Sequence, residues 1–162
     1  MPRNHLEDLV AESYELQGFF VRRNVRVGKR PNGGYNCELD IVAFHPKLRR
    51  LVQIEPSLDS DTWEERERRY AKKFEAGRRH IPAMFGGFTL PRKIEQIALF
   101  VYGGGGRTTL SGGRVLFIKD FMLQMEEYLY LNWRHVRSNA IPEAYPLLRT
   151  LQLAAEYWHL HR

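Results

Sequence analysis

Apolar residues recur at three- and four-residue spacing near the start of the chain, which is the period of a helix that buries one face. The positions that follow this spacing are Leu6, Leu9, Val10, Ser13 and Leu16. Asn4 precedes them and Glu7 lies three residues after Asn4, as in a capping box, while Gly18 is a typical helix stop. We therefore predict a helix over residues 4–17.

The rest of the chain alternates between apolar runs that favour strands and longer stretches that favour helices. The predicted strands cover residues 19–27, 37–44, 50–56, 94–102 and 115–118, and the predicted helices cover 61–79, 120–136 and 143–160. The order α-β-β-β-α-β-β-α-α indicates an α/β (α+β) fold, a mixed β-sheet flanked by helices. We expect one domain over residues 1–162, with a core at about 4–118 and a C-terminal helical extension at about 120–162.

The composition adds constraints on location and partners. With 43% hydrophobic residues and no apolar run of 18, we expect a cytoplasmic protein that does not enter a membrane. Cys37 is the only cysteine, which excludes an internal disulfide and a cysteine-based zinc site. The 25 basic and 19 acidic residues give a net charge of +6, which favours a polyanionic partner such as nucleic acid.

Two neighbouring predicted strands each carry a carboxylate inside an apolar run, Asp40 in the first and Glu55 in the second. Strand side chains alternate between faces, so Gln53, Glu55 and Ser57 share one face, and an antiparallel hairpin brings Asp40 opposite that face. Two close carboxylates repel each other unless a cation lies between them, and carboxylate oxygens suit Mg²⁺ or Mn²⁺. Such a metal site supports hydrolysis of a phosphodiester bond.

The helix, strand, turn and acid-bearing hairpin of residues 4–80 resemble the PD-(D/E)xK nuclease superfamily, which has the restriction-endonuclease-like fold. The resemblance implies a Mg²⁺- or Mn²⁺-dependent endonuclease that hydrolyses DNA, with Asp40 as the first acid and Glu55 as the second. The family's lysine position then holds Ser57, which departs from the pattern. A second register puts Gln53 at the acid position and Glu55 at the lysine position, so either register places Glu55 in the site.

The resemblance also implies roles for two residues outside the hairpin. Many members of the superfamily use a glutamate of the first helix, to which Glu7 corresponds as a further metal ligand, although Glu7 also fits a capping box; Glu12 is the weaker candidate. The role of the missing lysine can migrate to the helix after the third strand, where we favour Lys73 over Lys72. If no residue has taken over that role, the chain is a nuclease fold that binds nucleic acid without cutting it.

The partner surfaces are predicted from basic and aromatic residues. Basic residues cluster on the first predicted hairpin, where they are expected to contact the phosphates of double-stranded DNA: Arg22, Arg23, Arg26, Lys29 and Arg30. The C-terminal helices are rich in aromatic residues: Tyr128, Tyr130, Trp133, Tyr145, Tyr157 and Trp158. These pack the helices onto the sheet, form a homodimer contact or stack on bases. A subunit that binds a protein partner through these helices is the third function that the sequence leaves open.

Overall fold

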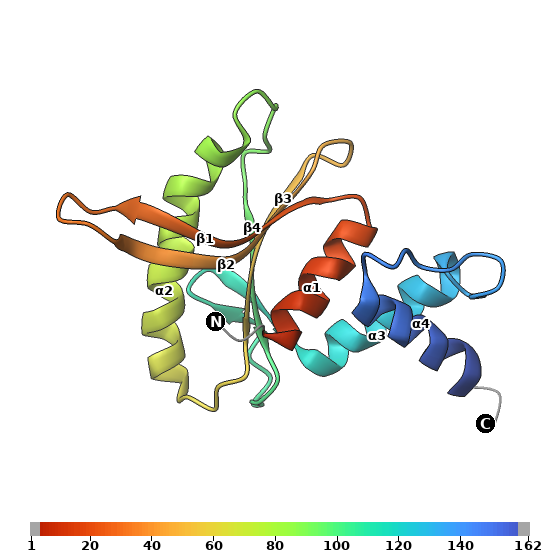
Figure 1. The fold of residues 1–162 in the computed structure, drawn as a ribbon. Coiled ribbons are helices and arrows are strands. Elements are labelled where there is room, and N and C mark those ends of the chain that lie inside the picture. The colour runs from red at the N-terminus through yellow and green to blue at the C-terminus, as the bar shows by residue number, and fades with distance from the viewer. Residues whose placement is uncertain (1–3, 159–162) are drawn as a thin grey trace.

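A six-stranded mixed sheet with helices on both faces makes up the computed structural model, which describes residues 4–158 (Figure 1). The elements in chain order are α1 (His5–Leu16), β1 (Phe20–Lys29), β2 (Tyr35–His45), β3 (Arg50–Ser57), α2 (Trp63–His80), the 3-10 helix η1 (Ile81–Phe85), β4 (Glu95–Phe100), β5 (Thr109–Leu110), β6 (Gly113–Phe117), α3 (Ile118–Asn132) and α4 (Pro146–Trp158). The predicted fold class and the order of the main elements are confirmed. The short strand β5 and the helix η1 were not predicted.

The order of strands across the sheet is β1-β2-β3-β4-β6-β5. β1, β2 and β3 form an antiparallel meander, whereas β3, β4 and β6 run parallel to one another. Parallel neighbours need a crossover connection, and α2 provides it between β3 and β4. The pairing of Ile41 with Ile54 brings the next residues of the two strands, Asp40 and Glu55, side by side at the end of the ladder.

Helices cover both faces of the sheet, and α2 lies on the opposite side from α1, α3 and α4 (Figure 1). The residues of the sheet that pack with α1, α3 and α4 include Ile41, Ile54 and Leu99. On the other face Tyr70 and Phe74 of α2 pack with strands β4 and β6. Side chains of β3 that alternate with Ile54 therefore point toward α2, which places a polar group of the sheet beneath this helix.

α2 lies very close to the sheet at Gly77. A Cβ atom added there would come within 1.9 Å of the Gln53 side-chain oxygen, so only glycine permits this approach. The helix begins after Thr62, whose hydroxyl accepts a hydrogen bond from the Glu65 backbone N–H, while the Glu65 carboxylate accepts one from the Thr62 N–H. This capping box fixes the start of α2, and the contact at Gly77 sets the distance between α2 and β3.

The β1–β2 hairpin extends beyond the rest of the sheet and passes beside α2 (Figure 1). Val25 and Leu39 of the hairpin pack with Ile81 and Phe85 of η1, which anchors its base. Asn24 adopts a left-handed backbone conformation with φ of 52°, and by the register of the hairpin it lies opposite Asp40. Asp40 therefore lies where the hairpin leaves the body of the sheet.

The C-terminal helices pack partly on the sheet and partly remain exposed. Trp133 and Tyr145 contact the core cluster, which agrees with a packing role, whereas Tyr157 and Trp158 are exposed. Base stacking and homodimer formation by these helices stay predictions. Among residues 4–158, no helix is long and apolar enough to cross a membrane.

Candidate active site

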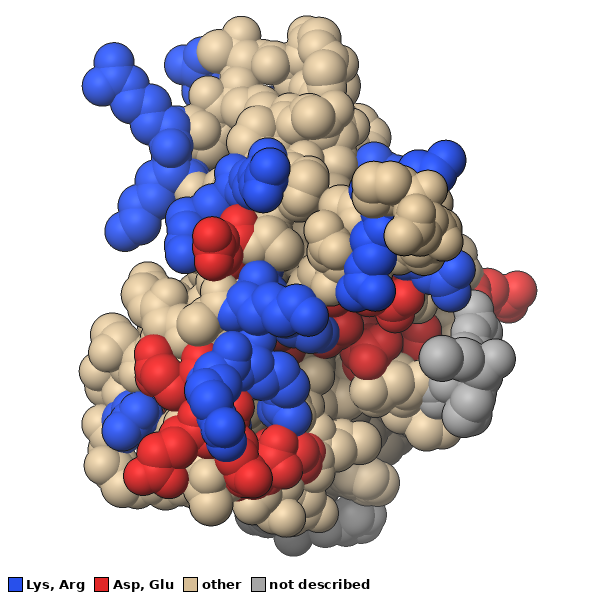
Figure 2. Space-filling view, turned by 90° about the vertical axis from the view of Figure 1, so that its left-hand side faces the viewer, with Lys and Arg blue, Asp and Glu red and all other residues tan. Residues whose placement is uncertain are grey.

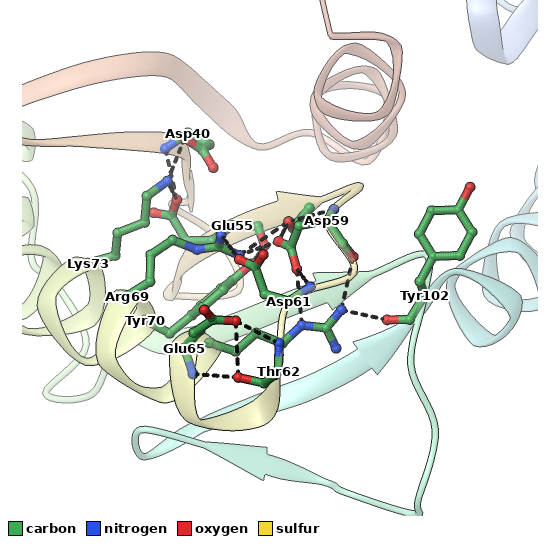
Figure 3. Close-up of polar contacts among 12 residues, drawn as sticks. Asp40, Glu55, Asp59, Asp61, Thr62, Glu65, Arg69, Tyr70, Lys73 and Tyr102 are labelled. Carbon is green, nitrogen blue, oxygen red and sulfur yellow. Dashed lines mark hydrogen bonds and ion pairs between the residues drawn. The ribbon is translucent and has the colours of Figure 1, made fainter.

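Side chains from three elements meet at one point between the sheet and α2. The Lys73 ammonium of α2 lies 2.8 Å from Oδ1 of Asp40 on β2 and 2.5 Å from Oε2 of Glu55 on β3 (Figure 3). The backbone N–H of Asp40 also donates to Oε2 of Glu55, at 3.3 Å. The predicted convergence of Asp40 and Glu55 is thus present, and Lys73 is the cation that lies between them.

The three side chains differ in their access to solvent. The Glu55 side chain is only 1% exposed, whereas those of Asp40 and Lys73 are 16% and 22% exposed. Water or a ligand therefore reaches the cluster from the side of Asp40 and Lys73. Glu55 forms the floor of the site, and the surrounding protein fixes its position.

The environment raises the pKa values of both Glu55 and Lys73. Burial, followed by the charge of Asp40, raises the pKa of the Glu55 carboxyl to about 8, against the opposing effect of the Lys73 ammonium. Burial disfavours the charged form of Lys73, but the charges of Glu55 and Asp40 and the hydrogen bonds to them outweigh it and raise the Lys73 pKa. Lys73 is therefore a permanent positive charge at this point.

A chain of buried amides binds the Glu55 oxygen that does not contact the Lys73 ammonium. Nε2 of Gln53 donates to Oε1 of Glu55 at 2.8 Å and to the Lys73 carbonyl at 3.1 Å. Oε1 of Gln53 accepts from Nε2 of Gln96 at 2.7 Å, and Oε1 of Gln96 accepts from Arg78 at 2.7 Å. Oε1 of Glu55 is thus occupied by an amide, and Oε2 is directed toward the cation.

Sequence reasoning missed Gln96, although a signal for it exists. Gln96 is a polar residue inside an apolar strand, which is the same pattern that identified Glu55. Arg78 carried no comparable signal, because the helix around it is rich in arginine and lysine.

Glu7 of α1 faces this site, and Glu12 does not. Burial raises the pKa of Glu7, the charge of Asp40 raises it further, and a hydrogen bond of 2.7 Å from the Asn4 side chain opposes the rise. Glu12 is buried elsewhere, where Oε2 accepts hydrogen bonds of 3.0 Å from the backbone N–H groups of Leu147 and Leu148. Glu12 therefore caps the N-terminal end of α4.

A second polar cluster around Asp59 and Arg69 lies next to the first (Figure 3), and Ser57 belongs to it. Its hydroxyl is hydrogen-bonded to the Asp59 carboxylate, which also binds Arg69 and lies 3.1 Å from Nε of the buried Arg66. Burial works against the ionised form of Asp59, but its bonds to Arg69 and Arg66 outweigh this and hold the Asp59 pKa below its ordinary value. Ser57 therefore stabilises the loop after β3 through its hydrogen bonds with Asp59 and Arg69.

The carboxylate oxygens of Asp40 and Glu55 are of the chemical type that a divalent cation prefers as ligands. They already converge on one positive group, and hard carboxylate ligands suit Mg²⁺ or Mn²⁺, which keep several water molecules when one or two carboxylates bind them. Within residues 4–158, no three acidic, histidine or cysteine side chains are grouped closely enough to hold one ion. Asp40 and Glu55 would thus be the direct ligands, and Glu7 adds negative charge nearby.

Basic side chains are numerous on the face that Figure 2 shows, and acidic side chains are intermixed with them. Four of the predicted hairpin residues are exposed: Arg22, Arg26, Lys29 and Arg30. Arg26 lies 3.3 Å from Glu38, an exposed pair of small energetic weight. Arg23 is not part of this surface, because it is bound to α1 by ion pairs of 2.8 Å with Asp8 and 3.3 Å with Glu15.

The raised pKa of Glu55 predicts a pH-dependent stability. Between its ordinary pKa of about 4.5 and its folded value of about 8, the folded protein holds a proton that the unfolded chain has released. The free energy of unfolding should therefore decrease as pH rises through this window. E55Q removes the titration, so wild type should lose stability relative to E55Q between pH 5 and pH 8 in urea unfolding experiments.

The matched control is E75Q, which changes an exposed glutamate of α2, the helix that covers Glu55. Its difference from wild type should stay constant with pH, because water screens exposed charges. A difference between wild type and E55Q that does not change with pH, or that favours wild type at pH 8, would contradict the described environment of Glu55.

No protein-family model and no curated protein matches this chain. The residues that converge in the structure are Asp40, Glu55 and Lys73, with Gln53 beneath them and Glu7 beside them.

Proposed function

We propose that this protein is a divalent-metal-dependent endonuclease that hydrolyses phosphodiester bonds of DNA and belongs to the PD-(D/E)xK type. The observation that carries the proposal is the meeting of Asp40, Glu55 and Lys73, two acids from adjacent strands and one lysine from the following helix. Two carboxylates and an ammonium, open to solvent on one side, are the groups that this chemistry requires.

Each residue of the site has a role that follows from its position. Asp40 and Glu55 would hold Mg²⁺ or Mn²⁺, which polarises a phosphate oxygen and lowers the pKa of a bound water. Lys73 would orient the attacking water and offset negative charge on the phosphate. Gln53 keeps Glu55 in place through its bond to Oε1, and Glu7 adds to the negative potential that attracts the metal.

The position of Lys73 favours one of the two registers of the motif. Gln53 is completely buried and its amide is bonded to Gln96 and to backbone, so it is a supporting residue and not an exposed ligand. This supports Glu55 as the second acid. The lysine of the motif is then replaced by Lys73, which reaches the same acid from α2.

A nuclease fold that binds nucleic acid without cutting it is the second candidate. It is favoured by the contact of Lys73 with both carboxylates, because an ammonium group there competes with a metal ion for the same oxygens. Such a protein would bind DNA in a salt-dependent way and leave it intact at every metal concentration.

We expect K73M to reduce Mg²⁺-dependent nicking of supercoiled plasmid DNA by about 10²–10³-fold, the usual effect of removing one group that stabilises transition-state charge. D40N and E55Q should abolish nicking, because each removes a charge that would hold the metal while nearly preserving side-chain volume. DNA affinity and the circular dichroism spectrum should stay close to those of wild type, which separates loss of chemistry from loss of fold.

The matched control is K72M, which removes the same charge from the adjacent, exposed position of α2. It should nick DNA at close to the wild-type rate. Equal rates for K73M and K72M, or wild-type nicking by D40N, would show that the site is assigned to the wrong residues. Absence of nicking by wild type with Mg²⁺ and with Mn²⁺, together with salt-sensitive DNA binding, would favour the second candidate.

The exposed hairpin residues predict how DNA affinity depends on salt. Each phosphate contact on duplex DNA contributes about 0.9 to the slope of log affinity against log salt. R22A/R26A should therefore lower the magnitude of this slope by about 2 and weaken binding to all sequences alike. Fluorescence anisotropy at several salt concentrations measures the slope.

R134A/R137A serves as the control, because it removes the same charge from exposed positions near the connection of α3 and α4. Its slope should match that of wild type. An unchanged slope in R22A/R26A, or an equal reduction in both double variants, would place the DNA contact outside the hairpin.

A further inference from the structure

A pocket of about 350 Å³ lies at the C-terminal end of α2, where α2, η1, the loop before β4 and the start of β3 meet. Its volume falls within the range of about 300–1,000 Å³ that is usual for small-molecule sites. The carboxylates of Asp40 and Glu55 do not line it. It is therefore a separate feature of the protein.

Three basic residues line this pocket, and the lining includes no acidic residue: Arg78, Arg92 and Lys93. Within residues 4–158 none of the three is in ion-pair contact with a carboxylate; Glu95 acts on Lys93 only through its charge at longer range, and its oxygens are bound to Arg50 by two hydrogen bonds of 2.8 Å. Like charges repel one another when they are gathered without a partner, so an anion in the pocket would relieve this repulsion.

The pocket is organised before any ligand binds. Gln96 is buried at its base and accepts a hydrogen bond of 2.7 Å from Arg78, which holds the guanidinium at the pocket. The other hydrogen bonds of Gln96, at 2.7 Å to Gln53 and to the Phe74 carbonyl, lock its amide in one orientation. A guanidinium fixed in this way loses little freedom when it binds a phosphate.

The remaining wall of the pocket is apolar. Leu51, Pro82, Leu90 and Ile94 contribute to it. A free inorganic anion would leave this wall unused, whereas a flat ring that carries a phosphate would contact both the wall and the cations. We propose that the pocket binds a nucleotide, free or at the end of a strand, with its phosphate on Arg78, Arg92 and Lys93 and its ring against the apolar wall.

The experiment is a titration of the ¹⁵N-labelled full-length protein, followed by NMR in EDTA at constant ionic strength, with inorganic phosphate, AMP and a short duplex that carries 5′-phosphates. AMP should give saturable shifts confined to the pocket, including the backbone amide of Ile94 and the side-chain amide of Gln96. It should bind more tightly than inorganic phosphate. Shifts with the duplex but not with AMP would identify the end of a strand as the source of the nucleotide.

R92A/K93A should weaken this binding by at least about tenfold (about 1.4 kcal/mol) and leave the fold intact, because both residues are exposed in a loop. R134A/R137A should leave it unchanged. Equal losses in the two double variants, shifts spread over all basic surfaces, or binding of both AMP and the duplex no tighter than that of inorganic phosphate would overturn the proposal. The test needs neither metal nor cleavage, so its outcome is independent of the proposed nuclease activity.

Discussion

A single ammonium group between two carboxylates is the interaction on which the candidate site depends. Glu55 is buried beneath α2, and Asp40 on the adjacent strand adds a second negative charge. Burial and the repulsion between the two carboxylates raise the pKa of Glu55, and a cation between them opposes that rise. Lys73 supplies that cation from α2. The site therefore forms only when this helix packs close enough to the sheet for the Lys73 ammonium to reach both carboxylates.

The distance of α2 from the sheet is set by packing and hydrogen bonds outside the Asp40–Glu55–Lys73 cluster. Gly77 allows the helix to touch Gln53, the Thr62 capping box fixes its first turn, and Tyr70 donates a hydrogen bond to the Glu55 carbonyl at 3.1 Å. Beneath it, the Gln96 amide donates to Gln53, and the Gln53 amide donates in turn to Glu55 and to the Lys73 carbonyl. Among the described residues, no buried side-chain nitrogen or oxygen lacks a hydrogen-bond partner. A polar layer in a core is costly unless it is fully satisfied, and here it also orients Glu55.

The sequence predicted the fold and the two acids because both depend on local patterns. Strand alternation places Asp40 and Glu55, since each is a carboxylate inside an apolar run, and the short antiparallel turn makes them neighbours. Contacts between elements distant in sequence were less predictable. Lys73 was favoured over Lys72 from the sequence, but it is one of many basic residues on its helix, and its contact with both acids depends on the packing of α2. Arg23 shares its hairpin with exposed arginines, yet the acids of α1 bind it.

The hydrogen-bond partners of Ser57 and Gln96 also could not be predicted from local sequence patterns. Ser57 follows Glu55 on the same strand face, but the loop after β3 brings Asp59 to it, which no local pattern predicts. Gln96 carried the right local signal, a polar residue in an apolar strand, but its partners Gln53 and Arg78 come from other elements. Side chains that act together across a sheet and a helix become visible only once the topology is known.

We propose that Asp40 and Glu55 form a cation site that Lys73 shares. The decisive test is a crystal structure determined from crystals grown with Mn²⁺, with an anomalous difference map. We expect an anomalous peak bound by the carboxylates of Asp40 and Glu55, with the Lys73 ammonium moved away from their shared position. Absence of a peak there, with Lys73 still in contact with both carboxylates at saturating Mn²⁺, would contradict it.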